Sequence, residues 1–195
     1  MRRRKNNHFA IELFLDVKFI KDGKVYLAIN KKAESLLRQF AAALINAMFG
    51  LGAPCKNVNN VSFTPRTSTS SSGTFAFTSG PGNTYIVLSA NTADQTLSFD
   101  DYKIQYSLGN LTRLSGHPQY ILGTGSDYLQ VRVKDKWTYT GSDTSITASA
   151  LYYKLVYDTS DSSHQVMLAK DVFNPALSLQ QNSLIDWSYI IRVSL

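Results

Sequence analysis

Residues 184–195 read LIDWSYIIRVSL, and apolar and polar side chains alternate along them. The odd-numbered positions are apolar throughout, whereas the even-numbered positions from Asp186 to Ser194 are polar with the exception of Ile190. A period of two is typical of a strand that rests one face on a core. We therefore expect a half-buried strand that lies inside a sheet, since a sheet keeps a terminal segment from fraying. The side chains expected to anchor the core are Trp187, Tyr189 and Ile191.

The composition of the 195-residue chain fits a single domain that is rich in strands. Hydrophobic residues make up 44% of the sequence, which is enough to build one sizeable core. Charged residues make up only 17%, so Ser, Thr, Asn and Gln must supply most of the polar surface. Such a weakly charged surface is typical of a β-rich protein. It is also typical of a protein whose surface is covered by neighbouring subunits, because charged residues are depleted at subunit contacts.

The start of the chain predicts a hairpin followed by a helix. Residues 8–20, HFAIELFLDVKFI, alternate like a strand, and Asp22-Gly23 is a strong signal for a tight turn to a second strand at 24–30. The period then changes to three and four, which predicts an amphipathic helix capped at Asn30 and ended by a glycine near residue 50. We expect its apolar stripe to cover a sheet, the alternative being contact with a neighbouring subunit or a lipid surface. The stripe includes the residues predicted for core or subunit packing, Leu36, Leu37, Phe40, Leu44 and Ile45.

From residue 74 onward, short alternating segments separated by turn residues indicate strands, and no helical period interrupts them. Regular spacing of this kind is typical of a sandwich or barrel. The predicted fold class is mainly β: an antiparallel β-sandwich, jelly-roll-like, with one amphipathic helix near the N-terminus. We expect one structural domain made of a basic disordered arm (1–8), the β-hairpin plus amphipathic helix (9–55), a polar loop (56–73) and the β-sandwich body (74–195).

The positive charge of the chain is concentrated at its start. Residues 1–56 hold eleven Lys and Arg against four acidic residues, whereas residues 57–195 hold nine against ten. A block of like charges repels itself, stays unfolded and attracts phosphate. We expect the block to bind nucleic acid or an acidic neighbouring subunit, the alternative being a solvated tail. Its members are Arg2, Arg3, Arg4 and Lys5.

No combination of residues in the sequence points to catalysis or to a metal. The three histidines have no second His or Cys at the spacing of a metal ligand. Asp100 and Asp101 are adjacent, so on a strand they would face opposite ways and form no acid–base pair. Cys55 is expected to be a buried thiol, with an intermolecular disulfide as the alternative. We therefore expect no catalytic residue, metal, cofactor or enzyme activity, and no membrane span, because the longest apolar run is too short.

Four stretches resemble, in their order and spacing, small β-sandwich virion proteins of viruses and proviruses of archaea and bacteria. They are SFDDYKI (98–104), SITASALYYKL (145–155), MLAKDVF (167–173) and SLIDWSYIIRV (183–193). The chain departs from that family's pattern at 148–150, where Glu-x-Gly is usual, at Lys170, where Arg is usual, and at Asn182, where a glycine is expected.

The resemblance implies a non-enzymatic virion component of a capsid, vertex, neck or tail. Such a component would be made in the host cytoplasm. It would assemble with copies of itself and with other virion proteins into symmetric oligomers. Its basic arm would face the genome or an acidic neighbouring subunit.

Two other functions are compatible with the same sequence. A carbohydrate- or receptor-binding β-sandwich module of a virus would stack exposed aromatic rings on sugars. A nucleic-acid-binding protein acting outside a virion would bind through residues 1–5, with an affinity that falls as salt rises. The tyrosines available for the first role are Tyr102, Tyr106, Tyr120, Tyr128, Tyr152 and Tyr153.

Overall fold

The computed structural model describes a chain that is mainly β, with antiparallel sheets and one α-helix among the described residues. The basic arm, the second half of the predicted polar loop and the strand expected at 74–79 lie outside those residues. The described residues are 10–33, 35–49, 51–64, 84–104, 107–113, 119–125, 128–156 and 163–194.

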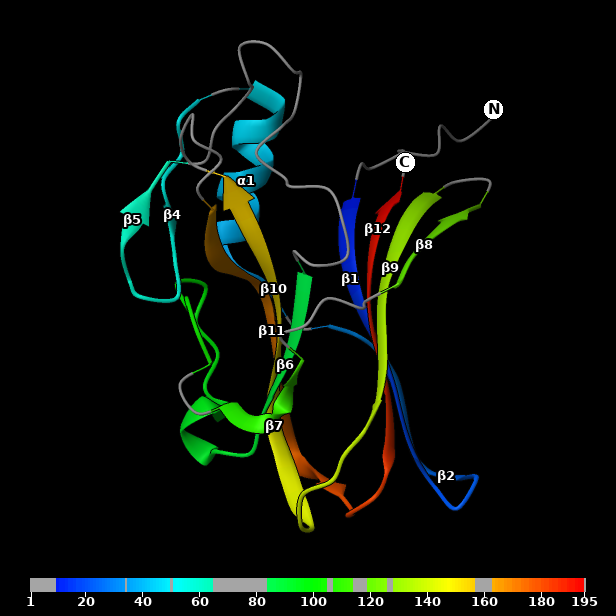
Figure 1. Cartoon of the computed structure of the whole chain (residues 1–195). Helices are drawn as coiled ribbons and strands as arrows, with labels where there is room; N and C mark the ends of the chain where they lie inside the picture. The colour runs from blue at the N-terminus through cyan, green and yellow to red at the C-terminus, as the bar shows by residue number, and fades with distance from the viewer. Residues whose placement is uncertain are drawn as a thin grey trace.

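Five antiparallel strands form one sheet, which we call sheet A (Figure 1). Its central strand, β12, pairs with β1 on one side and with β9 on the other along its whole length. The sequence-based prediction that this strand lies inside a sheet is therefore confirmed. In order across the sheet, the strands are β2 (Lys24–Lys32), β1 (Ala10–Lys21), β12 (Leu184–Ser194), β9 (Tyr128–Thr138) and β8 (Gln119–Thr124).

Five further strands form sheet B. The long strands β10 and β11 pair along most of their length, and β11 joins into one strand two segments that the sequence predicts separately, QVMLAKDVF and ALSL. In order, the strands are β3 (Ser35–Leu36), β11 (Ser163–Leu179), β10 (Thr144–Val156), β6 (Thr84–Ser89) and β7 (Ser107–Arg113).

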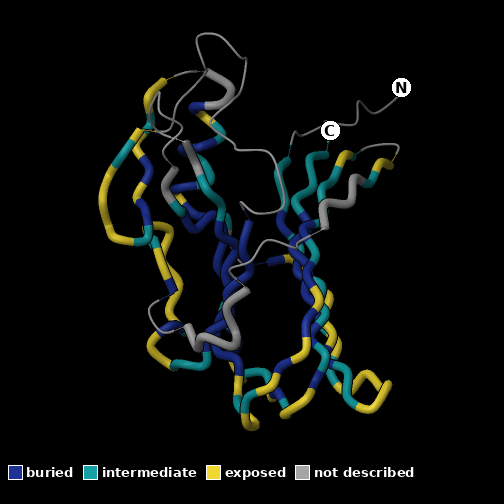
Figure 2. The backbone as a smooth tube through the Cα atoms, in the orientation of Figure 1, coloured by how far each residue is buried: buried dark blue, intermediate teal, exposed yellow. Residues whose placement is uncertain are grey.

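The main hydrophobic core is shared by the two sheets. Trp187 of β12 is fully buried, and its ring lies 5.9 Å from that of Phe173 of β11 and 6.3 Å from that of Phe19 of β1. Figure 2 shows the buried backbone concentrated along the facing sides of the two layers. The side chains from sheet A alternate along each strand, which is the pattern that the sequence predicts. The fully buried core residues include Leu15, Val17, Phe19, Ile146, Leu179, Ile185, Trp187 and Tyr189.

The turn between β1 and β2 has the conformation that Asp-Gly predicts. Asp22 and Gly23 both have positive φ angles, 51° and 74°. Two successive residues with positive φ are the mark of the type I′ turn, whose twist matches that of a hairpin. The predicted hairpin is confirmed.

The helix α1 (Arg38–Phe49) begins later than the sequence predicts and follows three strands. The expectation of a helix that starts after Asn30, close to the N-terminus, was wrong. β2 continues to Lys32, which pairs with Phe14, and the short β3 then pairs with β11. Sheet hydrogen bonds to distant strands override the local helical period over these residues.

The helix also buries a stripe different from the predicted one. Its buried positions are Gln39, Ala42, Ala43 and Asn46, which have the spacing of one helical face. The two alanines pack against Val166 and Leu168 of β11. Both polar members are satisfied: Asn46, for example, exchanges hydrogen bonds of 2.7 and 2.6 Å with the backbone of Ala53.

A small hairpin follows the helix, formed by β4 (Cys55–Lys56) and β5 (Ser62–Phe63). The first part of the predicted polar loop thus contains a strand pair. Cys55 and Phe63 pack with α1 over β11. The helix and this hairpin therefore cover part of β11 in sheet B. In contrast, no described helix or strand lies over the outer face of sheet A (Figure 1).

Candidate functional site

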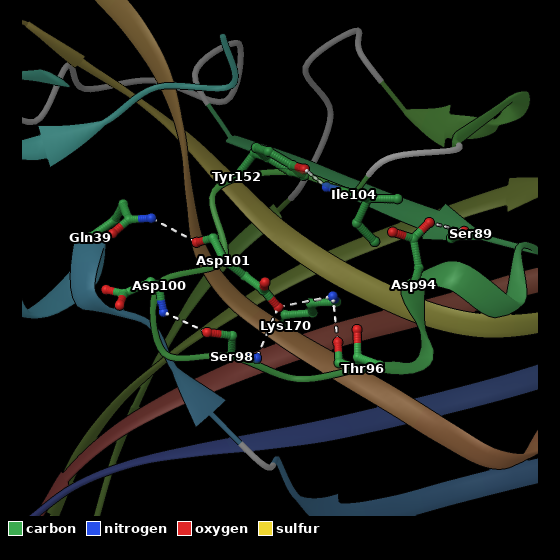
Figure 3. Close-up of polar contacts among 10 residues, drawn as sticks. All are labelled: Gln39, Ser89, Asp94, Thr96, Ser98, Asp100, Asp101, Ile104, Tyr152 and Lys170. Carbon is green, nitrogen blue, oxygen red and sulfur yellow. Dashed lines mark hydrogen bonds and ion pairs between the residues drawn. The ribbon is translucent and has the colours of Figure 1, made fainter. Parts of the chain in front are cut away.

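A segment that we call the strap, residues 91–104, runs along the outer side of sheet B (Figure 3). It starts with the 3-10 helix η2 (Thr92–Gln95), where the Asn91 side chain accepts a hydrogen bond of 2.8 Å from the backbone N–H two residues on. The Asp94 carboxylate, 1% exposed, accepts a hydrogen bond of 2.6 Å from the Ser89 hydroxyl of β6. These contacts attach one end of the strap to sheet B.

A buried ion pair holds the middle of the strap. Lys170 of β11 is 3% exposed, and its Nζ donates hydrogen bonds to Asp101 Oδ2 at 2.9 Å and to the Thr96 carbonyl at 2.7 Å. The same carboxylate oxygen accepts a hydrogen bond of 3.1 Å from the Ser98 backbone N–H. An ammonium group removed from water needs an anion and further acceptors, and the strap supplies both.

The strap also contacts the start of the helix and strand β10. Gln39 of α1 donates from Nε2 to the Asp101 carbonyl at 2.6 Å, and Arg38 forms an ion pair with Asp100. At the other end, the Tyr152 hydroxyl of β10 accepts the Ile104 N–H at 2.6 Å. Burial raises the pKa of Tyr152 above its usual value, so the hydroxyl stays neutral. Side chains from four elements thus converge on one segment (Figure 3).

The chemistry of this cluster is that of an attachment rather than of a reaction. The carboxylates of Asp94 and Asp101 are occupied by hydrogen bonds from Ser89 and Lys170. Among the described residues, no group of three or more His, Cys, Asp or Glu could hold a metal ion. The arrangement therefore positions backbone and excludes water, and it offers no acid–base pair.

Cys55 lies outside this cluster, beneath the helix. Its side chain is 1% exposed, and burial raises the pKa of the thiol to about 12. Such a thiol stays protonated at neutral pH, and only the thiolate is an effective nucleophile. The predicted buried thiol is confirmed.

The outer face of sheet A is a second candidate surface. The even-numbered residues of β1, β9 and β12 point away from the core, because their odd-numbered neighbours are buried in it. Along β9, three basic residues succeed one another on this face, and Asp186 of β12 lies between a lysine of β1 and one of β9. On β1, β2, β9 and β12 the face carries six basic residues, Lys18, Lys32, Arg132, Lys134, Lys136 and Arg192, and three acidic ones, Glu12, Asp16 and Asp186.

The acidic residues of this face lie deeper than the basic residues that pair with them. No ion pair among the described residues includes Lys18 or Lys136, and both are exposed. The face therefore presents positive charge to solvent. The three pairs, with the exposed fractions of the basic and the acidic side chain, are Arg132–Asp16 at 3.0 Å (30% and 18%), Lys134–Asp186 at 3.0 Å (29% and 17%) and Lys32–Glu12 at 2.7 Å (63% and 28%).

Arg192 of β12 is held in place at one end of this face. Its Cζ lies 4.6 Å from the ring centre of Phe14 and 4.5 Å from that of Tyr128. Its Nε and Nη2 donate to Gln130 Oε1 at 3.2 and 3.0 Å. A guanidinium group between two aromatic rings is attracted to both and loses little orientation freedom on binding a further partner.

The predicted packing residues of the helix region lie in different surroundings. Leu37 is fully buried against the outer side of sheet B, whereas Leu36, Phe40 and Leu44 are partly buried. Ile45 is 38% exposed, and it belongs to no core cluster among the described residues. Its role in subunit packing stays a prediction.

The structure describes the predicted core anchors of β12 but not the residues of the basic arm. Trp187 and Tyr189 are fully buried in the core, and Ile191 is partly buried and packs against it. The Tyr189 hydroxyl lies 2.7 Å from the Ser149 hydroxyl of β10, which joins the two sheets. The arm residues Arg2, Arg3, Arg4 and Lys5 lie outside the described residues.

Sequence reasoning missed both the strap cluster and the charged face. The face had a local signal, since Arg132, Lys134 and Lys136 occupy alternate positions of one predicted strand. The cluster had none, because Lys170 and Asp101 are 69 residues apart.

The fold and these surfaces define a class: a mainly antiparallel β protein with two five-stranded sheets, one of them with a basic outer face. Comparisons with protein-family models, curated proteins and solved structures found no match for the chain. Within the described part of the chain, no helix has the length and apolar character needed to cross a membrane.

Proposed function

We propose that this chain is a non-enzymatic structural protein of a virion, a component of its capsid, vertex, neck or tail. It is made in the host cytoplasm and assembles with copies of itself and with other virion proteins into symmetric oligomers. The support comes from the resemblance of four sequence stretches to such proteins and from where those stretches lie in the fold.

One observation carries the proposal: residues of three of the four stretches meet in a single structural cluster. Asp101 from SFDDYKI pairs with Lys170 from MLAKDVF, and the Tyr152 hydroxyl from SITASALYYKL receives the Ile104 N–H. The residues that carry the resemblance therefore attach the strap and join strands. Motifs with such structural roles support a building block.

We infer that the two sheets form a β-sandwich. Sheets A and B share one hydrophobic core, and the hydroxyls of Tyr189 and Ser149 meet between them. A shared core between two antiparallel sheets is the defining feature of a sandwich. The jelly-roll type stays a prediction, because consecutive strands such as β8 and β9, or β10 and β11, pair within one sheet.

Assembly is proposed to use the free edges of sheet A, β2 and β8. On β2, Val25 is 52% exposed and Tyr26 is 36% exposed. A symmetric contact between the β2 strands of two copies is less favourable. With the two-fold axis at Ala28, Lys24 of each copy would lie opposite Lys32 of the other, and like charges opposite each other are destabilising. The edge is better suited to β8 of another copy, whose segment QYILGT carries no charge. Such a head-to-tail contact generates a ring where the rotation between copies closes, and symmetric oligomers require that closure.

The basic arm remains part of this proposal. Arg2, Arg3, Arg4 and Lys5 would neutralise phosphates of a packaged genome or contact an acidic neighbouring subunit. The arm precedes β1 in the sequence, and the first described residue of β1, Ala10, pairs with Ser194, two residues after Arg192.

The carbohydrate- or receptor-binding module has less support from the described tyrosines. Tyr152 is 3% exposed, and Arg192 lies over the Tyr128 ring. The Tyr102 ring has Lys56 and Lys103 beside it, 6.0 and 5.8 Å from its centre. The side chains of the tyrosines at 106 and 120 lie outside the described part. A binding signal on a glycan array would favour this alternative.

Light scattering coupled to size-exclusion chromatography tests the assembly. We expect a large, discrete oligomer for the wild type and smaller species for Val25→Lys, which adds charge to the β2 edge. Val61→Lys is the matched control, because Val61 is also 52% exposed but lies in the β4–β5 hairpin. A wild-type monomer of 21.7 kDa would overturn self-assembly. Removal of residues 1–8 should release any co-purifying nucleic acid if the arm faces the genome.

A further inference from the structure

The two sheets differ in what covers their outer faces. The outer face of sheet B is apolar and lies under the strap, and α1 and the β4–β5 hairpin pack against β11. No described helix or strand covers the outer face of sheet A, and the strands of this sheet are more exposed than those of sheet B (Figure 2). Six basic residues stand on this open face against three acidic ones, and each acidic residue lies beneath its basic partner.

We infer that the outer face of sheet A binds the phosphodiester backbone of nucleic acid. This goes beyond the proposed function, since it assigns a phosphate contact to a folded surface separate from the arm, and it holds whether or not the chain belongs to a virion. The contacting groups would be Lys18 and Lys136, which have no acidic partner within ion-pair distance among the described residues, together with Arg132 and Lys134.

The arrangement of the charges fits a polyanion. Arg132, Lys134 and Lys136 alternate along one strand, so successive basic groups are spaced by roughly 7 Å. Lys18 stands two strands away in the same row as Lys136, with Asp186 between them. Asp186 already binds Lys134 at 3.0 Å, so three lysines surround a single carboxylate. A bound phosphate would relieve the repulsion among these lysines.

A protein partner fits the same face less well. The centres of protein interfaces are depleted of charge and rich in apolar side chains. Here the basic residues occupy the middle of the sheet, and Ile190 beneath them is only 5% exposed. The surface offers the phosphates of a nucleic acid several basic contacts along β9 and across the sheet to β1.

Arg192 extends this surface toward the start of β1. Its guanidinium group is already oriented by Phe14, Tyr128 and Gln130. A guanidinium group held in this way binds a phosphate with two parallel hydrogen bonds at a small loss of side-chain freedom. We therefore expect Arg192 to mark one end of the bound strand.

The test compares two double variants of the full-length chain. Lys18→Gln/Lys136→Gln removes the two basic residues of the face that pair with no described acidic residue, so no carboxylate loses its partner. Lys56→Gln/Lys103→Gln is the matched control: both lysines are exposed, both lie beside Tyr102 at the strap, and the change in net charge is the same. The probe is a fluorescein-labelled 30-nucleotide DNA, single-stranded or as a duplex, and its anisotropy is titrated from 50 to 400 mM NaCl.

We expect the face variant to reduce the slope of log K against log salt by about 1.4 for the single strand and about 1.8 for the duplex. The control should leave the slope unchanged. Equal slopes for wild type and face variant would overturn the inference, as would a loss of all binding in a variant whose arm residues 2–5 are glutamine. Equal or tighter binding of polyglutamate at the same salt would overturn it in favour of an acidic protein partner.

A measurement on the wild-type protein gives an independent result. Bound DNA should protect Lys18 and Lys136 from acetylation by a water-soluble reagent, read by mass spectrometry, while Lys56 and Lys103 react as before. Uniform protection, or none, would contradict the assignment of the contact to sheet A. Neither readout depends on oligomerisation, so this inference and the assembly proposal fail independently.

Discussion

Replacement of Lys170 by methionine should loosen the strap without disturbing the main core. The side chain is 3% exposed, and it bonds Asp101 and the Thr96 carbonyl at 2.9 and 2.7 Å. Removing one partner of a buried ion pair costs about 3–5 kcal/mol. The Asp101 side chain is 24% exposed and keeps its Ser98 hydrogen bond, so water offsets part of that loss. We expect Lys170→Met to lower the free energy of unfolding by about 2–4 kcal/mol.

Urea unfolding at pH 7, followed by tryptophan fluorescence, measures this loss. Asp101→Asn and the double variant complete a thermodynamic cycle, in which the two residues should couple by about 1–3 kcal/mol because they touch. Lys103→Met is the control, since Lys103 is exposed two residues after Asp101, and it should change stability by less than about 0.5 kcal/mol. Additive single effects would refute the view that the ion pair holds the strap.

Two further predictions concern buried side chains. Trp187→Ala removes a fully buried ring and should cost about 3–5 kcal/mol, so a variant that melts at the wild-type temperature would contradict the buried position of β12. Burial raises the pKa of Cys55 from 9.0 to about 12. Its contribution to stability is therefore complete below pH 9 and is lost as pH rises toward 12. Between these values, urea midpoints of the wild type should fall more steeply than those of Cys55→Ala; parallel curves would exclude this contribution.

Much of sheet A could be read from local sequence. Alternation predicts β1, β9 and β12 because a half-buried strand repeats every two residues. Asp22-Gly23 predicts the β1–β2 turn because both residues tolerate positive φ. The alternation of β12 predicts its buried face, and its pairing with both β1 and β9 places it inside the sheet.

The helix shows where local reasoning ends. Its period is clear in the sequence, yet its first turn was misplaced because β2 and β3 take residues up to Leu36 into sheets. Its buried face was also misplaced. Gln39 and Asn46 are buried because the strap and Ala53 supply hydrogen bonds to them, and a polar residue with such partners is as acceptable in an interior as an apolar one.

The alternation of apolar and polar residues was thus sufficient to predict that the chain is rich in strands and which side of each strand faces the core. Both properties depend on residues that are close in the sequence. The surroundings of Lys170, the strap and the basic face depended on the folded chain. Lys170 reads as a surface residue until β11 is set beside Asp101, and Lys18 and Lys136 become neighbours of Asp186 only when β1, β12 and β9 pair in register. Charges interact through space over a few ångströms, whereas the sequence shows only which residues are neighbours along the backbone.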